Sequence, residues 1–170
     1  SHRAQIGFKQ VTANYTYDIG VAAVPSSSQS IDLINSDRNI PKRTVFNVAP
    51  YLRYRYKMGK QRSLRIDYRG YSSQPSMNQL QPVEDRSDPL RIVVGNPELK
   101  PAFQNWFRAR FNDYDEKTQR AIMAMVNGGF TTNSIISETT YDSKTGGQRT
   151  TYRNVNGVWN AAGMFMYSTP

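Results

Sequence analysis

The stretch that decides the fold is Gly95-Asn96-Pro97-Glu98-Leu99-Lys100-Pro101. Its two prolines fix φ at about −65°, and a residue that precedes a proline is pushed towards extended geometry. Its glycine can adopt a positive φ that other residues avoid. We therefore expect a rigid structural corner, which ends a loop and sets the register of the following strand. The residues assigned to this corner are Gly95, Asn96, Pro97, Leu99 and Pro101.

Segments on both sides of the corner alternate apolar and polar residues, which is the period of a β-strand. In the segment 43–58, Tyr54 and Tyr56 fall on one parity and Arg53 and Arg55 on the other. The same alternation predicts six long strands, over about 4–24, 43–58, 61–71, 101–113, 118–131 and 157–168. The run 121–126 is apolar at every position, so a buried helical turn is the alternative there. Pro50 is expected to mark an edge, a bend or a bulge.

The connections between these strands alternate in length. Those at 25–42, 72–100 and 132–156 are long, whereas those at 59–61 and 113–117 are short turns. Outer-membrane β-barrels have short turns at one rim and long loops at the other. The predicted fold class is therefore all-β, an antiparallel up-and-down meander that is part of a larger outer-membrane barrel. Within the long connections we expect an extended piece at 91–94 and a hairpin whose turn is 142–147.

Positive charge dominates the chain, and seven basic residues of the predicted strands 43–58, 61–71 and 101–113 lie on one parity: Arg53, Arg55, Lys57, Arg65, Arg69, Arg108 and Arg110. The formal net charge is +9, and the arginines lie opposite the aromatic residues. In a barrel these arginines would face the lumen and the apolar residues would face lipid. A soluble sheet with one wet face gives the same pattern, so the alternative is a soluble basic β-sheet module that binds nucleic acid or another polyanion. The candidate lumen-facing residues are Arg53, Arg55, Arg65, Arg69, Arg108 and Arg110.

Aromatic residues gather towards the ends of the predicted strands, with Tyr71 and Trp159 among them. This placement suits the aromatic girdles of a membrane barrel, where amphipathic rings lie at the interface. Aromatic residues also favour strands in any sheet, because they pack against their cross-strand neighbours. Both interpretations stay open on the sequence alone.

Residues for catalysis are scarce. The chain has no cysteine and one histidine, His2, so we expect neither a metal site nor a nucleophilic triad. Acidic residues cluster at 84–88 and at 113–116, but neither cluster has the spacing of a calcium loop or a partner base. No apolar run is long enough for a transmembrane helix. We expect no enzyme activity and no cofactor.

Three motifs together resemble a known family. They are the heptapeptide at 95–101, YRGYSSQPSMNQLQP at 68–82, and YRNVNG at 152–157. In combination they are similar to the β-barrel region of TonB-dependent outer-membrane receptors of the Bacteroidetes type, over most of residues 43–170. Two positions depart from the family pattern: Gln74 stands where an arginine is usual, and Ala102 where a glutamate is usual. Both lie in expected loops, so they bear on loop contacts more than on the fold.

The resemblance implies an active-transport receptor in the bacterial outer membrane. Receptors of this class have a large barrel, commonly of about 22 strands, which a separate plug domain closes. The implied partners are outer-membrane lipid, the remainder of the barrel, the plug, and TonB through an N-terminal part absent from this sequence; nucleic acid is not expected. We expect residues 1–170 to be one segment of the barrel wall, with no plug domain. An excised segment has unpaired edges and would form an open or an intermolecular sheet.

Overall fold

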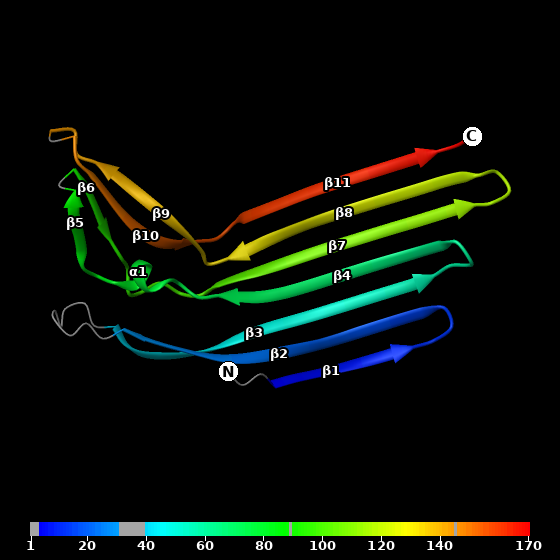
Figure 1. Ribbon diagram of the computed structural model, residues 1–170, viewed down its shortest axis with the longest axis horizontal. Coiled ribbons are helices and arrows are strands. Elements are labelled where there is room, and N and C mark those ends of the chain that lie inside the picture. The colour runs from blue at the N-terminus through cyan, green and yellow to red at the C-terminus, as the bar shows by residue number, and fades with distance from the viewer. Residues whose placement is uncertain (1–3, 31–39, 89, 145) are drawn as a thin grey trace.

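The computed structural model describes residues 4–30, 40–88, 90–144 and 146–170, most of which lie in one large sheet (Figure 1). Seven strands form this sheet in the order β1-β2-β3-β4-β7-β8-β11, and each neighbouring pair is antiparallel. The sheet is open, with β1 and β11 at its edges, and is consistent with a segment of barrel wall; the predicted fold class is confirmed. The strands are β1 Ala4–Val11, β2 Tyr15–Ser30, β3 Ile40–Lys57, β4 Arg62–Ser73, β7 Ala102–Asp115, β8 Arg120–Thr132 and β11 Val158–Ser168.

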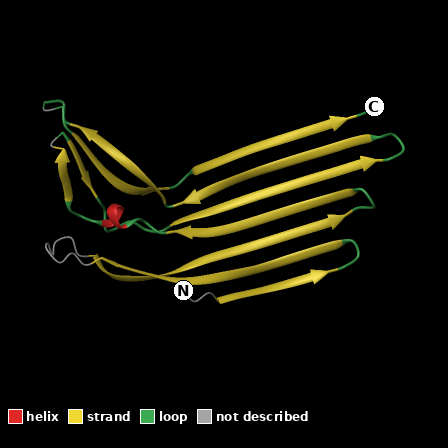
Figure 2. Ribbon diagram, viewed as in Figure 1, coloured by secondary structure: helices red, strands yellow, loops and turns green. Residues whose placement is uncertain are grey.

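The connections are sorted by end, as expected. The bounds 25–42 expected for the first long connection are wrong, because β2 continues to Ser30 and β3 begins at Ile40; residues 31–39 lie outside the described part of the chain. Short turns at 12–14, 58–61 and 116–119 lie at one end of the sheet, and the long connections lie at the other (Figure 2). The run 121–126 belongs to β8, so the helical alternative for it is wrong. Pairing between β3 and β4 stops at Tyr51, beside Pro50, which has no N–H to donate. Pro50 nevertheless continues the pairing of β3 with β2, opposite Val21.

The segment 4–24, expected as a single strand, is two strands joined by a tight turn. Thr12 closes this turn: its backbone N–H and its hydroxyl both donate to the carbonyl of Tyr15, at 2.8 and 3.0 Å. The same hydroxyl accepts the backbone N–H of Tyr15 at 3.1 Å. The alternation of apolar and polar residues does not reveal the turn, because Val11 and Tyr15 have the same sequence parity and so look like neighbours on one face of a single strand. The register pairs Val11 with Thr16, so Val11 and Tyr15 lie on opposite faces of the sheet.

The two long connections after β4 and β8 combine into a second sheet of four strands. Its order is β5-β6-β10-β9, and β6 and β10 are parallel. The predicted extended piece is β6, Arg91–Val94, and the predicted hairpin is β9, Ser134–Tyr141, with β10, Gln148–Val155. The short elements β5, Glu84–Asp88, and α1, Met77–Leu80, were not predicted. Among the described residues, no helix is long and apolar enough to cross a membrane.

Helix α1 begins with a capping box, a signal that the sequence does carry. The Ser76 hydroxyl accepts the Gln79 N–H at 3.3 Å, and the Gln79 side-chain oxygen accepts the Ser76 N–H at 2.9 Å. This reciprocal pair satisfies two backbone donors at the start of the helix. The helix lies where the long connection leaves the large sheet (Figure 1).

The large sheet has no core of its own. The accessible surface is 12126 Å², whereas a compact monomer of this mass exposes about 8,500 Å². Among the described residues, the buried apolar side chains are Ala22, Leu80, Leu99 and Ala102, and three of these four belong to α1, the corner and the start of β7. The expectation that Ala102 lies in a loop is therefore wrong, because it pairs with Ser73 as the first residue of β7. The stability of the large sheet therefore depends on what covers its two faces.

Candidate functional site

The large sheet has one apolar face and one face that we call the basic face. Side chains directly opposite each other on paired strands share a face, so the registers sort them. Several apolar side chains are strongly exposed, including Ile6 and Trp159 at 74% and Phe165 at 70%. The apolar face carries Ile6, Phe8, Ile19, Leu52, Tyr54, Ile66, Tyr68, Phe107, Val126, Phe130, Trp159 and Phe165.

Rings on the apolar face form contacts across strands. The centroids of Tyr68 and Phe107 are 4.8 Å apart, and those of Phe107 and Phe130 are 6.1 Å apart. Near the short turns, register pairs Tyr15 with Tyr56. A face this apolar and this exposed is what lipid would cover.

All six arginines singled out in the sequence lie on the basic face, in neighbouring rows. One row crosses three strands as Arg55, Arg65 and Arg110, and the next as Arg53, Asp67 and Arg108. Among the side chains that the structure describes, and with the lysines included, this face carries eight basic residues and two acidic ones. The basic residues are Lys9, Arg53, Arg55, Lys57, Arg65, Arg69, Arg108 and Arg110, and the acidic residues are Asp18 and Asp67.

The row of Arg55, Arg65 and Arg110 places like charges directly opposite one another, which destabilises a sheet. The nearby carboxylates offset only part of this repulsion. Asp67 is bound by Arg65 through two contacts, at 2.8 and 3.2 Å. Asp18 lies 3.8 Å from Arg53. The face as a whole therefore has a positive electrostatic potential.

Two aromatic residues on the basic face were missed from the sequence. Tyr51 and Trp106 lie on either side of Arg69 in a third row, Tyr51–Arg69–Trp106. The guanidinium carbon of Arg53 lies 5.7 Å from the Tyr51 ring centroid, and that of Arg108 lies 4.6 Å from the Trp106 ring. Both distances suit cation–π contacts. Tyr51 and Trp106 have the same sequence parity as the arginines of their strands, and this signal could have identified them.

Tyr71, expected among the interfacial aromatics, also lies on the basic face. It falls opposite Gln104, and its hydroxyl donates to the Gln104 side-chain oxygen. The interpretation as a girdle residue is therefore wrong for Tyr71, because it shares the parity of Arg69 and not that of Tyr68. Trp159 does lie on the apolar face.

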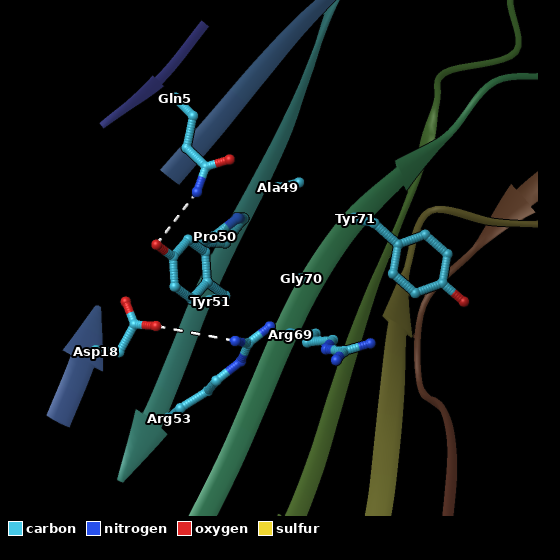
Figure 3. A pocket seen from close by; sticks show the side chains of 9 residues that line it. All are labelled: Gln5, Asp18, Ala49, Pro50, Tyr51, Arg53, Arg69, Gly70 and Tyr71. Carbon is cyan, nitrogen blue, oxygen red and sulfur yellow. Dashed lines mark hydrogen bonds and ion pairs between the residues drawn. The ribbon is translucent and has the colours of Figure 1, made fainter. Parts of the chain in front are cut away.

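A hollow of about 440 Å³ opens on the basic face beside Arg69 (Figure 3). Arg53 and Arg69 both line it, and the guanidinium group of Arg53 lies between Tyr51 and Arg69 (Figure 3). At one side of the hollow, the side-chain nitrogen of Gln5 donates a hydrogen bond to the Tyr51 hydroxyl at 3.3 Å. The complete lining is Gln5, Asp18, Ala49, Pro50, Tyr51, Arg53, Arg69, Gly70 and Tyr71.

The corner at 95–101 binds to its surroundings through backbone groups. Gly95 donates its N–H to the Gln81 carbonyl at 2.9 Å, and Asn96 donates to the Gln79 carbonyl at 2.6 Å. The Asn96 side chain accepts the Glu98 N–H at 2.9 Å, which forms a tight local turn. Leu99 is buried, with 1% of its surface exposed.

Gly95 is required for a different reason from the one expected. Its φ is not positive; a Cβ at this position would lie 2.3 Å from the Gln81 carbonyl oxygen and 2.8 Å from that of Asn78. The glycine therefore permits close approach of the corner to the end of α1, and its conformational freedom is not used.

The three sequence motifs meet at this corner. Asn96 donates from its side chain to the Tyr152 carbonyl at 3.0 Å, which joins the heptapeptide to YRNVNG. The contacts with Gln79 and Gln81 join it to the motif at 68–82. Spatial contact explains why the three motifs occur together: each supplies hydrogen-bond partners for another.

The acidic clusters have structural partners. Asp113 is bound by Arg62 through two contacts of 3.0 Å and by Arg120 at 3.4 Å. Asp115 accepts the backbone N–H of Lys117 at 3.0 Å in the adjoining turn. In the part of the chain that the structure describes, no group of three or more His, Cys, Asp or Glu side chains could hold a metal ion.

Comparison with known proteins agrees with the exposed apolar face. The model of the outer membrane protein beta-barrel family matches residues 7–170, which is nearly the whole chain. Searches of curated proteins and of solved structures found no matching protein. Family membership places the chain in the bacterial outer membrane. The chain belongs to the outer membrane protein beta-barrel family, and its seven-stranded sheet is a segment of the barrel.

Proposed function

We propose that the chain forms part of the wall of a TonB-dependent receptor of the Bacteroidetes type, which takes up an anionic solute across the outer membrane. Family membership and the open antiparallel sheet support the barrel. The three motifs that meet at the corner support the receptor class. We assign the chain a transport role and no catalysis.

The observation that carries the proposal is the basic face. Lipid is enough to cover the apolar face. The basic face, with eight basic and two acidic side chains among those described, is instead suited to an anionic ligand. In a barrel the face opposite lipid lines the lumen. A lumen lined by one sign of charge concentrates solutes of the opposite sign.

The partners follow from the two faces and the two edges. Lipid covers the apolar face, and the unpaired edges of β1 and β11 pair with the remaining strands of the barrel. A plug domain fills the lumen, and TonB acts on the plug side of the receptor. Nucleic acid is not a partner, because a soluble polyanion-binding module conflicts with membership of an outer-membrane family.

Uptake by cells tests this function. Cells that produce the complete outer-membrane protein are supplied with radiolabelled solutes that carry phosphate or carboxylate groups, with and without TonB. We expect uptake of at least one anionic solute that is lost without TonB, while the protein stays folded in the outer membrane. Uptake that is unchanged without TonB would overturn the proposal.

A further inference from the structure

On the basic face, two of the described arginines, Arg69 and Arg108, have no acidic partner, and Arg53 beside them reaches one only at 3.8 Å. Arg69 lies between Tyr51 and Trp106 in its row, and Arg53 and Arg108 occupy the diagonal positions on the two neighbouring strands. Diagonal residues of this kind are about 7–8 Å apart, which long side chains span. Three arginines therefore occupy neighbouring positions on this face of the sheet.

Two of these groups are oriented by aromatic rings. Arg53 stacks over Tyr51 and Arg108 over Trp106, each with the ring two residues before it on its own strand. Stacking restricts the side chain but leaves the edge of the guanidinium free to donate hydrogen bonds. A group that is already oriented loses less conformational entropy when it binds an anion.

The carboxylates that could neutralise this region are distant or already engaged. Asp67 lies between Arg53 and Arg108 in register, but both of its oxygens bind Arg65. Asp18 reaches Arg53 only at 3.8 Å, and the Arg53 side chain is 54% exposed. Within the described residues, the Arg69 guanidinium has neither an ion pair nor a hydrogen bond, and Arg69 lines the hollow in Figure 3.

We propose that this hollow is an oxyanion subsite, in which Arg69 and Arg53 bind a phosphate or carboxylate group of the transported solute and Arg108 adds charge from the next strand. The subsite rests on the proposed function and adds to it the position and chemistry of one contact. Arginine suits this role because its planar fork donates two parallel hydrogen bonds to such groups. Tyr51 and Tyr71 form the walls of the hollow and limit the volume around the anion.

Equilibrium binding to the complete detergent-solubilised protein tests the subsite. The probes are inorganic phosphate and citrate, which separate phosphate from carboxylate recognition, with glycerol as the neutral control. We expect Arg69→Gln to weaken binding of the preferred probe about tenfold, the loss of one charge-assisted contact. Arg69→Lys keeps the charge but not the fork, so we expect a smaller loss of about threefold.

Two matched variants distinguish a subsite from a general field. Arg55→Gln removes the same charge from the same face two residues beyond Arg53, and we expect a loss of about twofold. Arg91→Gln changes an exposed arginine on β6 in the second sheet, and we expect no change. Equal losses for Arg69→Gln and Arg55→Gln would overturn the subsite but leave anionic transport standing. Absence of both phosphate and citrate binding would also overturn the subsite; acidic groups of the plug that fill the hollow would give this result. Uptake that does not depend on TonB would instead overturn the proposed function.

Discussion

Asn154 holds the backbone of Lys100 in the way that a neighbouring strand would. Its side-chain oxygen accepts the Lys100 N–H at 2.8 Å, and its side-chain nitrogen donates to the Lys100 carbonyl at 2.9 Å. The same nitrogen donates to the Asn133 carbonyl at 2.8 Å. One side chain of β10 thus joins the end of the corner to the connection between β8 and β9.

Replacement of this residue should loosen the long-loop end of the barrel. Asn154→Ala removes three hydrogen bonds, and we expect the free energy of unfolding to fall by about 1–3 kcal/mol. Denaturant titration of the complete protein measures the loss, and limited proteolysis should show faster cleavage within 72–101. Asn78→Ala, which alters an exposed asparagine of α1, is the control and should change neither quantity. Equal protease resistance of the Asn154 variant and the wild type would contradict this role.

Gly95 is predicted to tolerate no side chain. In Gly95→Ala the new methyl would lie 2.3 Å from a backbone oxygen that cannot move without distortion of α1. We expect the free energy of unfolding to fall by about 1–3 kcal/mol or more, which is the usual cost of atomic overlap in a packed region. The temperature at which the folded barrel converts to its unfolded gel mobility should fall. Gly163→Ala is the control, since its Cβ would have contacts of 3.7 Å or more, and it should leave that temperature unchanged. A normal transition for the Gly95 variant would mean that the corner is not packed against α1.

The strands were predictable from the sequence because each faces two different environments. Alternation located β3, β4, β7, β8 and β11 to within a few residues, and the lengths of the connections gave the up-and-down order. The turn at Thr12 escaped because Val11 has the sequence parity of Tyr15, although the two residues lie on opposite faces of the sheet. Local signals for α1 existed in its capping box, but an element of four residues lies below the length that periodicity detects.

The composition of the basic face was only partly predictable. The arginines stood out because charge is rare within strands, whereas Tyr51 and Trp106 were hidden among aromatic residues that face the other way. Pairing across strands far apart in sequence decides which groups become neighbours. Arg53 and Arg108 meet Arg69 through registers that no local pattern specifies.

An ion cluster at the short-turn end should couple β4 to β7 and β8. Asp113 has a side chain only 10% exposed and is shared by Arg62 and Arg120. A double-mutant cycle with Arg62→Gln and Asp113→Asn should give a larger coupling energy than a fully exposed pair does, because one partner is shielded. The free energies come from denaturant titrations. The pair Arg153 and Glu138, each about half exposed, is the comparison and should couple by less than about 0.5 kcal/mol. Equal coupling of the two pairs would show that shielding of Asp113 has no energetic effect.

The same substitution at adjacent residues of β8 should have costs of different size, because the two residues face different media. Val126 lies on the apolar face opposite Ala109 and is 60% exposed, while Asn127 lies on the basic face opposite Arg108. Val126→Arg should lower the free energy of unfolding in lipid vesicles by about 2–4 kcal/mol, the cost of an arginine that faces the middle of a bilayer. Asn127→Arg adds repulsion from Arg108 but stays in a polar environment, so it should cost about 1 kcal/mol or less. Urea titration of the complete protein in phosphatidylcholine vesicles measures both. A cost for Asn127→Arg that equals or exceeds the cost for Val126→Arg would mean that the apolar face of this sheet does not face lipid.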